Sequence, residues 1–405
     1  MANPSIVSSP PSISGLSDLL APITQDDFFQ TYWEQKPMIL HREDSRYFEH
    51  LITIGQVDQL LELHRPTGQS IRVVKDQQPL NPSKFEELDG SLNLNQLYAA
   101  YADGYTVVVN EIQRFWSPLR KLCQAVSDTL SHQTVANLYL TPKGQQALKP
   151  HHDSHDVFVI QVHGQKHWRI YDPVVETPLH NSFQPIFSRE SLLNEREITL
   201  SAGDVMYMPR GVPHDAYTTD QSSLHLTIGV HPAQWLDLIM SALQLQAQSQ
   251  ISLRKALPPG YLNPKAWTGS FASEMQETFV ALMNEVAQTL NLNSGVHMLA
   301  EGWRNQQLPH ADGQFESIDQ MGDLTAETWV TKRQGMVCSV QSLAGGVKFS
   351  YPGNTINGPS RALGAFAFIA QSEDQFQVGD LPGLPANNQI QLIARLIRGG
   401  LIKIS

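Results

Sequence analysis

The sequence has few of the features that mark secreted or membrane proteins. Its 405 residues include only two cysteines, Cys123 and Cys338, which supports neither a disulfide framework nor a cysteine zinc site. No apolar run reaches the roughly eighteen residues that a membrane-spanning helix needs. Residues 1–17 lack the basic and apolar regions of a secretory signal. We therefore expect a cytoplasmic protein without a membrane span, with a disordered tail at residues 1–20.

Basic residues are also in short supply. The chain has 28 Lys and Arg against 39 Asp and Glu, and its formal net charge is −11. Because affinity for nucleic acid comes mainly from Lys and Arg that neutralise phosphates, we expect no direct nucleic-acid binding. An acidic protein can attract a basic protein substrate, although acidity also serves simply to keep a protein dissolved.

Periodicity separates the chain into three structured regions. Short strands divided by Gly, Pro and Asp turns run from about residue 137 to residue 230, which is typical of an all-β barrel or sandwich. Apolar residues at helical spacing follow over 232–290. A helix over 388–398, two glycines and a strand over 401–404 are compatible with a winged helix. We expect an α+β protein with a barrel domain at 21–231, a helical region at 232–305 and a winged-helix-like domain at 306–405.

The most informative segment is Pro150-His151-His152-Asp153-Ser154-His155, which precedes an apolar strand expected at residues 157–162. In a strand, residues i and i+2 point to one face, so His151 and Asp153 should project together. One imidazole and one carboxylate are two thirds of the facial triad that holds non-haem Fe(II) with open positions. By the same alternation His152 should pack in the interior, while His155 is a candidate for the substrate side or for supporting the ligands.

A third metal ligand must come from a distant strand. The best candidate is His214, which follows the Gly203-Asp204 turn and a strand expected at residues 205–208. The few strands of a barrel that lie between Asp153 and His214 in the sequence would bring His214 back to the end of the barrel at which His151 and Asp153 lie. The alternative reading is an ordinary turn histidine after Pro213.

An iron oxygenase also needs an electron source, and a 2-oxo acid co-substrate is one. A distal carboxylate buried in a barrel requires a cation and a hydroxyl to offset its desolvation. Lys166 shares a strand face with Trp168 and Ile170, so it is expected inside the barrel, where a lysine is costly without an anion. Tyr139 lies on the strand before the histidine-rich loop and can supply the hydroxyl. Alternatively, Lys166 is a solvated lysine beside a turn.

Taken together, these motifs resemble the JmjC-type, 2-oxoglutarate-dependent ribosomal oxygenases of the cupin superfamily. The resemblance extends through residues 27–231 and is carried by Asp27-Phe28-Phe29, Tyr32 to Pro37, Tyr139 to Pro142, Pro150 to Asp153, Asp156 to Phe158 with Gln161, Gly164 to Arg169, and Gly203-Asp204 through Pro209-Arg210-Gly211 to His214. The order of a catalytic domain, helices and a small C-terminal domain is also that of the family.

The resemblance implies a double-stranded β-helix (jelly-roll) catalytic domain that uses Fe(II), 2-oxoglutarate and O2 to hydroxylate a side chain of a protein, a ribosomal protein in this family. It implies that the iron ligands are His151, Asp153 and His214. It further implies that Lys166 and Tyr139 bind the distal carboxylate of 2-oxoglutarate, and that Asn137 lies near substrate and co-substrate. The C-terminal winged helix of the family is not a nucleic-acid reader, which agrees with the acidic charge.

Two other functions stay open at this point. One is a metal-binding cupin of other activity, or a scaffold without 2-oxoglutarate turnover. The other is a nucleic-acid-associated regulator that uses the C-terminal domain, although the helix over 388–398 carries only Arg395 and Arg398 as charges. No residue of the substrate pocket selects an arginyl, a histidyl or another target.

The helical region predicts a homodimer, as does the family resemblance. Its apolar faces include Trp235, Leu238, Ile239, Phe279 and Leu282, and a helix pair outside a barrel cannot bury both faces within one subunit. The alternative is that these helices pack between the barrel and the C-terminal domain.

Overall fold

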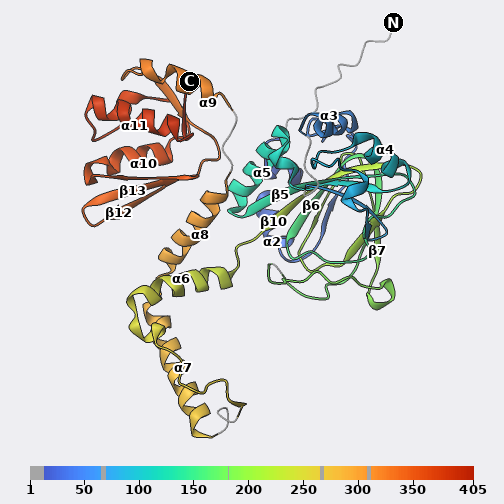
Figure 1. Ribbon diagram of the computed structural model, residues 1–405, viewed down its shortest axis with the longest axis horizontal. Coiled ribbons are helices and arrows are strands. Elements are labelled where there is room, and N and C mark those ends of the chain that lie inside the picture. The colour runs from blue at the N-terminus through green and yellow to red at the C-terminus, as the bar shows by residue number, and fades with distance from the viewer. Residues whose placement is uncertain (1–12, 65–69, 181, 265–268, 308–311) are drawn as a thin grey trace. The chain divides into compact units, whose positions relative to one another are not determined.

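The computed structural model describes residues 13–64, 70–180, 182–264, 269–307 and 312–405 (Figure 1). Contacts divide the chain into two compact units, Met1–Pro232 and Ala233–Ser405. Within the described ranges, no helix has the length and apolar character needed to cross a membrane.

The first unit is built on a large antiparallel sheet. Its strands follow the order β1 (Met38–Leu40), β8 (Val205–Met208), β6 (Asp156–Ile170), β10 (Ser223–His231), β5 (Gln133–Thr141), β4 (Thr106–Val109), β2 (Ile71–Lys75) and β3 (Gln78–Pro79). Two further strands, β7 (Arg196–Ser201) and β9 (His214–Tyr217), pair with the second half of β6, and β9 also bridges to His151 and Gln146. Because β6 takes part in both groups of strands, it folds them face to face as in a jelly roll.

The bend that allows this double role lies at Gly164. Its φ of +67° is in the left-handed region, and a Cβ there would lie 1.8 Å from the carbonyl oxygen of Ser222. The register between β6 and β10 shifts at the neighbouring pair Leu224/His225. The strand expected at 157–162 and the strand expected to carry Lys166, Trp168 and Ile170 are therefore one bent strand, since the glycine turns the chain without breaking the ladder.

Apolar side chains between the two groups of strands form a compact interior, which comprises Val157, Val159, Trp168, Ile170, Leu200, Met206, Met208 and Val212. A larger core lies on the other face of the main sheet, under α1 (Leu16–Leu20), α2 (Gln25–Thr31), α3 (Ile54–His64), α4 (Leu94–Ala102) and α5 (Ser117–Leu130). The stripe of α5 facing this core comprises Leu119, Leu122, Cys123 and Val126, as helical spacing predicts.

Part of the predicted disordered tail is ordered. Residues 1–12 lie outside the described residues, but Leu16, Leu19 and Leu20 of α1 are buried, so the prediction of disorder over 1–20 is wrong for this helix. The three leucines sit at helical spacing, and their burial stabilises a short helix that local sequence alone would leave unfolded.

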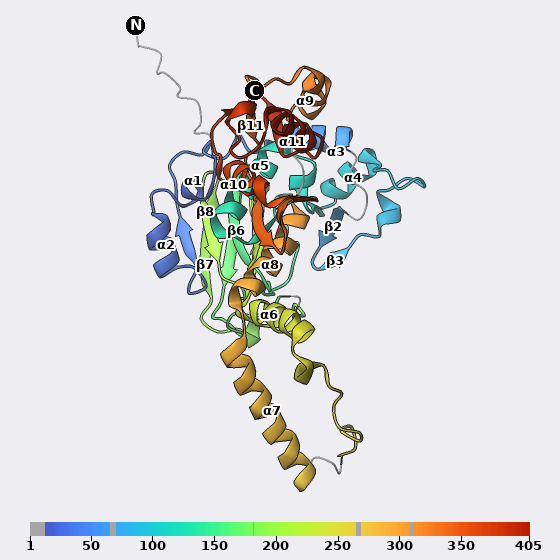
Figure 2. The ribbon, with the colours of Figure 1, turned by 90° about the vertical axis from the view of Figure 1, so that its left-hand side faces the viewer.

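The second unit begins with three helices, α6 (Trp235–Ser249), α7 (Ser270–Thr289) and α8 (Leu292–Gln306). α6 packs on α8, and the approach is close at Gly295, where a Cβ would lie 3.0 Å from Ala242 and Leu238 side-chain atoms. Figure 2 shows α7 as a long helix beside the irregular chain that follows α6.

The rest of this unit has its own core. Two three-stranded sheets, β15-β11-β16 and β12-β13-β14, combine with three helices around buried residues that include Phe349, Phe366 and Ile393. The elements are α9 (Gln314–Asp319), β11 (Trp329–Lys332), β12 (Ser339–Leu343), β13 (Gly346–Tyr351), β14 (Asn354–Gly358), α10 (Leu363–Gln371), β15 (Phe376–Gln377), α11 (Ala386–Arg398) and β16 (Ile402–Ile404). The helix and the strand expected near the C-terminus correspond to α11 and β16.

Candidate metal centre and co-substrate cavity

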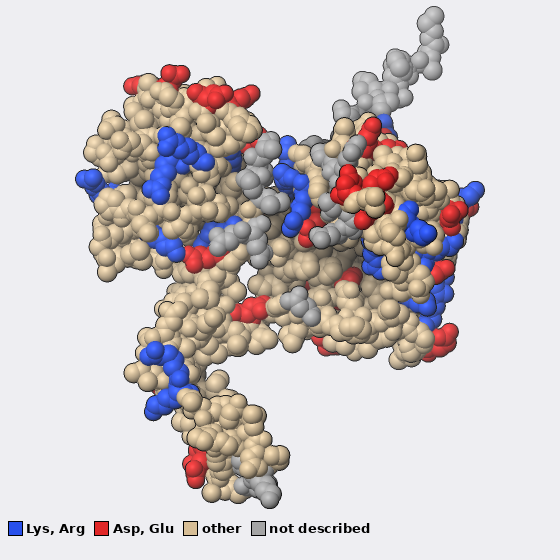
Figure 3. All heavy atoms as spheres, in the orientation of Figure 1, with Lys and Arg blue, Asp and Glu red and all other residues tan. Residues whose placement is uncertain are grey.

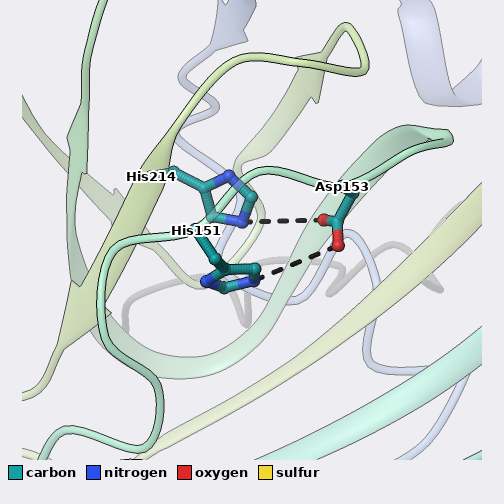
Figure 4. A group of neighbouring side chains, drawn as sticks. All are labelled: His151, Asp153 and His214. Atoms are coloured by element: carbon teal, nitrogen blue, oxygen red, sulfur yellow. Dashed lines mark ion pairs between the residues drawn. The ribbon is translucent and has the colours of Figure 1, made fainter. Parts of the chain in front are cut away.

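Three side chains converge at the mouth of the jelly roll (Figure 4). His151 and Asp153 lie in irregular chain just before β6, and His214 is the first residue of β9. The N–H of His151 donates to the carbonyl of His214 (3.1 Å), and the N–H of His214 donates back to the carbonyl of His151 (2.8 Å). This reciprocal pair holds the two imidazoles side by side, with ring centroids 4.6 Å apart.

The donor atoms of the three side chains face one another. His151 Nε2 lies 4.0 Å from Asp153 Oδ1, His214 Nε2 lies 3.7 Å from Asp153 Oδ2, and one ligand atom from each residue lies within 4.8 Å of the others. Each Nδ1 faces a carbonyl oxygen, that of Lys149 for His151 (2.9 Å) and that of Val212 for His214 (3.1 Å). A carbonyl accepts only, so each Nδ1 carries the proton and each Nε2 keeps a free lone pair.

Two imidazole nitrogens and one carboxylate on one side of a point suit a non-haem Fe(II) ion with open positions. Burial, and next the neighbouring His151, lower the pKa of His214 to about 4, so this imidazole is neutral at pH 7 as a ligand must be. Burial alone would raise the pKa of Asp153, but the surrounding histidines, His151 first, hold it below its ordinary value. The donor chemistry therefore fits the expected metal.

A cavity of about 100 Å³ extends from these three residues into the jelly roll. Its walls include Asn137, Tyr139, His155, Val159, Lys166, Trp168, Met208, His225 and Thr227. In the register of β5 with β10, Tyr139 lies opposite His225 and Asn137 opposite Thr227, so the two strands form successive rungs along the cavity.

Lys166 lies at the inner end, as predicted, and is 3% exposed. Its Nζ donates to Thr141 Oγ1 (2.9 Å), and no carboxylate lies within ion-pair distance of it among the described residues. Burial lowers the pKa of Lys166 to about 7. A buried amine without an anion is a binding position for an anionic group of a ligand.

Tyr139 and Asn137 are both in the cavity wall. The Tyr139 ring stacks on His225 at 4.8 Å and 3°, and burial raises the pKa of Tyr139 to about 12, so its hydroxyl is neutral. Asn137 Oδ1 accepts from the backbone N–H of Glu111 (3.0 Å), which fixes the amide on β5.

The other two histidines of the loop separate as expected. His152 is buried and contacts Phe187, away from the cavity, whereas His155 lies in the cavity wall and stacks on His231. The reason is not strand alternation, because residues 151–153 precede β6. Backbone pairing of His151 with His214 sets the orientation instead.

A carboxylate network supports the third ligand from behind. Asp215 is 1% exposed and accepts hydrogen bonds from four side chains on three segments, namely Arg169 Nη1 (3.1 Å) and the Tyr171 hydroxyl (3.0 Å) at the end of β6, Arg189 Nη2 (2.7 Å) and Gln146 Nε2 (3.0 Å). These bonds fix the start of β9 and thus the position of His214.

Three residues at or next to the cavity were not found from the sequence, namely His225 in its wall, Thr141 beside Lys166 and Gln184 beside Asp153. Thr141 was missed although it has the same parity on β5 as Asn137 and Tyr139, a signal that was available. His225 is a polar residue between two leucines of the strand Leu224-His225-Leu226, and this interruption was also a signal that the sequence offered. Gln184, which donates to Asp153 Oδ1 (2.9 Å), lies in an irregular loop and had no such signal.

Part of the chain matches a known protein family. Residues 109–238 match the family model of the JmjC domain. This chain contains a JmjC domain. The predicted resemblance and the predicted fold class, an α+β protein with a double-stranded β-helix, are thereby confirmed.

The chain is similar to curated proteins that carry two different names. It is 30% identical over 317 residues to the bifunctional lysine-specific demethylase and histidyl-hydroxylase NO66 of Drosophila mojavensis, covering 73% of this chain and 35% of the relative. It is 30% identical over 254 residues to ribosomal oxygenase 1 of Danio rerio, covering 60% and 46%. The chain thus spans less than half the length of these two relatives.

Solved structures agree with the fold of the chain. A crystal structure of the Escherichia coli ribosomal oxygenase YcfD has a TM-score of 0.54 at 15% identity, covering 95% of this chain and 98% of that one. A structure of YcfD in complex with cobalt and 2-oxoglutarate has a TM-score of 0.51 at 16% identity, covering 94% and 98%.

Proposed function

We propose that this chain is an Fe(II)- and 2-oxoglutarate-dependent dioxygenase that hydroxylates a side chain of a protein. We further propose that its substrate is a ribosomal protein. The observation that carries the proposal is the pairing of two sites in one cavity. His151, Asp153 and His214 form an open three-ligand face at the mouth, and Lys166 lies at the inner end, where none of the described residues gives it a carboxylate partner. A dicarboxylate that chelates a metal at one end and meets an amine at the other matches both.

Each residue has a defined role in the proposed reaction. Bound Fe(II) would supply the redox and Lewis-acid chemistry that couples 2-oxoglutarate and O2 to hydroxylation. His151 and His214 present Nε2 because their Nδ1 protons are held by carbonyls. Lys166 and Tyr139 receive the distal carboxylate, Asn137 orients substrate and co-substrate, and the apolar side chains Val159 and Met208 keep water away from the interior.

The relatives support this reading. The Drosophila relative is named as a lysine-specific demethylase and histidyl-hydroxylase, and the Danio relative is named as a ribosomal oxygenase. YcfD binds cobalt and 2-oxoglutarate in one structure. A metal-binding cupin of other activity is the second candidate. Lys166 favours the first, because a cupin that binds no anionic co-substrate gains nothing from a buried, unpaired amine.

The test is turnover with defined components. Purified protein with Fe(II), O2 and ribosomal proteins from cells that lack the gene should convert 2-oxoglutarate to succinate, and mass spectrometry should find one added oxygen on a single ribosomal protein. The same modification should be present in ribosomes from cells that have the gene. Metal binding without 2-oxoglutarate consumption under any of these conditions would instead support the second candidate.

We also propose a homodimer through α6, α7 and α8. Trp235, Met240 and Phe279 are 77%, 57% and 59% exposed, and exposed apolar faces of this size normally mark an interface. The visible face of the segment carries few charged side chains (Figure 3). A two-fold assembly would bury such faces against each other.

Sedimentation at micromolar concentration decides the oligomeric state. Phe279→Asp with Met283→Asp should give a folded monomer, because both side chains are exposed in the single chain. Gln276→Asp, on the same helix and also exposed, should remain dimeric. Leu238 is a poor target, since its side chain packs at Gly295 within the chain. A monomeric wild type would remove the proposal.

We assign the catalytic role to residues 21–231, dimerisation to 232–305 and a supporting, non-nucleic-acid-binding role to the winged-helix-like domain at 306–405. A cytoplasmic location suits a protein whose Cys123 and Cys338 are both free thiols.

A further inference from the structure

His225 stands out among the cavity residues. It projects from the middle of β10, is 3% exposed, and its Nδ1 has no hydrogen-bond partner among the residues that the structure describes. His225 lines the cavity, and its Nδ1 is shielded, so Nε2 is the ring nitrogen that can donate to a ligand there. A buried polar ring without a protein partner is costly, which indicates that a ligand completes its hydrogen bonds.

The walls around His225 hold its ring firmly. Its face stacks on Tyr139 (4.8 Å between centroids), and the edge of its ring meets Trp168 (5.5 Å, 80°). Trp168 in turn contacts His214, at 5.9 Å. His225 therefore occupies the stretch of the cavity between the three-ligand face and Lys166, and has little freedom to turn away.

The ionisable groups facing His225 are Lys166 on β6 and Tyr139 on β5, the latter neutral. Burial first, and then the charge of Lys166, hold the pKa of His225 well below its ordinary value. A neutral imidazole carries one N–H donor and no charge, whereas Lys166 supplies a charge when it is protonated. The pair can thus offer one cation and one further donor to a single carboxylate, without two adjacent positive charges.

We propose that His225 is a specificity-determining residue of the cavity, which stays neutral and donates a hydrogen bond to the distal carboxylate of the 2-oxo acid. This inference rests on the proposed function and adds a contact to it. His225 distinguishes a 2-oxo acid that ends in a carboxylate from one of equal length that ends in a methyl group, because only the carboxylate accepts its N–H. Lys166 alone would favour any anion.

A matched pair of ligands tests this contact. 2-Oxoglutarate and 2-oxopentanoate have the same number of carbons and differ at the distal end. The binding of each to the full-length protein is measured anaerobically at saturating Fe(II), or with Zn(II) in its place. His225→Phe keeps the ring and loses the donor, and it should weaken 2-oxoglutarate about ten- to a hundredfold, as expected for a hydrogen bond to a charged group. 2-Oxopentanoate binding should change by no more than about twofold.

Controls separate the donor from the shape of the cavity. His163→Phe, at an exposed position of the same β6 that carries Lys166, should leave both affinities unchanged. His225→Asn and His225→Gln carry an amide donor at the two positions of the ring nitrogens, and one of them should recover most of the lost affinity. These variants also keep the test valid if His225→Phe does not fold.

The pH profile tests the neutral state. 2-Oxoglutarate affinity of the wild type should change in one step, belonging to Lys166, and His225→Phe should retain that step. A second step that disappears in His225→Phe would show that His225 gains a proton on binding, and would overturn the proposal.

The remaining outcomes separate the two proposals. Equal loss of both ligands, or no loss of either, in His225→Phe overturns the assignment of His225 but leaves the proposed function intact, provided that the wild type binds 2-oxoglutarate and Lys166→Met does not. A wild type that fails to bind 2-oxoglutarate with any metal overturns both.

Discussion

Replacing Lys166 by Met tests the inner end of the cavity most directly. The substitution keeps the length and volume of the side chain and removes its charge. The pKa of Lys166 falls from 10.5 to about 7 through burial, which at 1.36 kcal/mol per pH unit is a penalty of about 5 kcal/mol on the charged amine. A carboxylate bound at Lys166 recovers much of that penalty. Loss of one partner of a buried pair costs about 3–5 kcal/mol, so 2-oxoglutarate should bind at least a hundredfold more weakly to Lys166→Met.

The affinity for 2-oxoglutarate should depend on pH through the charge of Lys166. In the free protein Lys166 is charged below about pH 7 and neutral above it. A bound carboxylate raises the pKa of Lys166, so binding above pH 7 requires uptake of one proton. Wild-type affinity should therefore be constant below about pH 7 and fall about tenfold per pH unit above it, until the pKa of the complex is reached.

The assay is calorimetric titration of 2-oxoglutarate at saturating Zn(II) between pH 6 and 9, with wild type and Lys166→Met side by side. His163→Met is the matched control at an exposed position of the same strand. Equal affinities for Lys166→Met and the wild type, or an affinity that increases from pH 7 to 9, would refute the assignment of this end of the cavity.

Three other predictions concern the metal, the hydroxyl and stability. Alanine at His151, Asp153 or His214 should abolish iron binding measured by equilibrium dialysis, because two ligands hold a divalent ion weakly. His152→Ala should retain the metal. Iron binding by His214→Ala at wild-type strength would exclude His214 as a metal ligand. Tyr139→Phe should weaken 2-oxoglutarate by about 1 kcal/mol, the value of one neutral hydrogen bond, and an unchanged affinity in the same titration would remove Tyr139 from the contact. The unfolded state binds more protons at Lys166 than the folded state, so the free energy of unfolding of ligand-free protein should rise between about pH 7 and about pH 10.5. Urea unfolding at pH 7 should accordingly find Lys166→Met a few kcal/mol more stable than the wild type, and a less stable variant would contradict a buried, unpaired amine.

The fold class and the position of Lys166 were predictable from the sequence because each rests on a local pattern. Alternating strands with turn residues predict a barrel, and a lysine with the parity of Trp168 and Ile170 points inward. The single strand β6 was not predictable, because a glycine between two apolar runs signals a turn as readily as a bend, and only pairing on both sides decides.

His151 and Asp153 were predicted as metal ligands on the assumption that they lie in a strand, but the backbone at these residues is not a strand. Alternation in a strand was the premise, yet His151 and Asp153 lie before the strand, and a long-range backbone pair with His214 orients them. Gln184 could not be found at all, since nothing in an irregular loop tells which residue returns to Asp153. His225 was missed for a different reason, because one histidine in an apolar strand is more often a core residue than a ligand.

The reciprocal backbone hydrogen bonds between His151 and His214 have a consequence for the life cycle of the protein. They tie two distant segments by groups that no metal touches, so the two imidazoles are brought together by folding itself. The free energy of metal binding is then not consumed in ordering the chain, unlike in zinc fingers, where it is the free energy of folding. A chelator should strip the ion from a protein that remains folded, and the same molecule should accept a fresh ion without refolding. Damage by stray oxidation of the iron would be repairable by simple exchange of the ion.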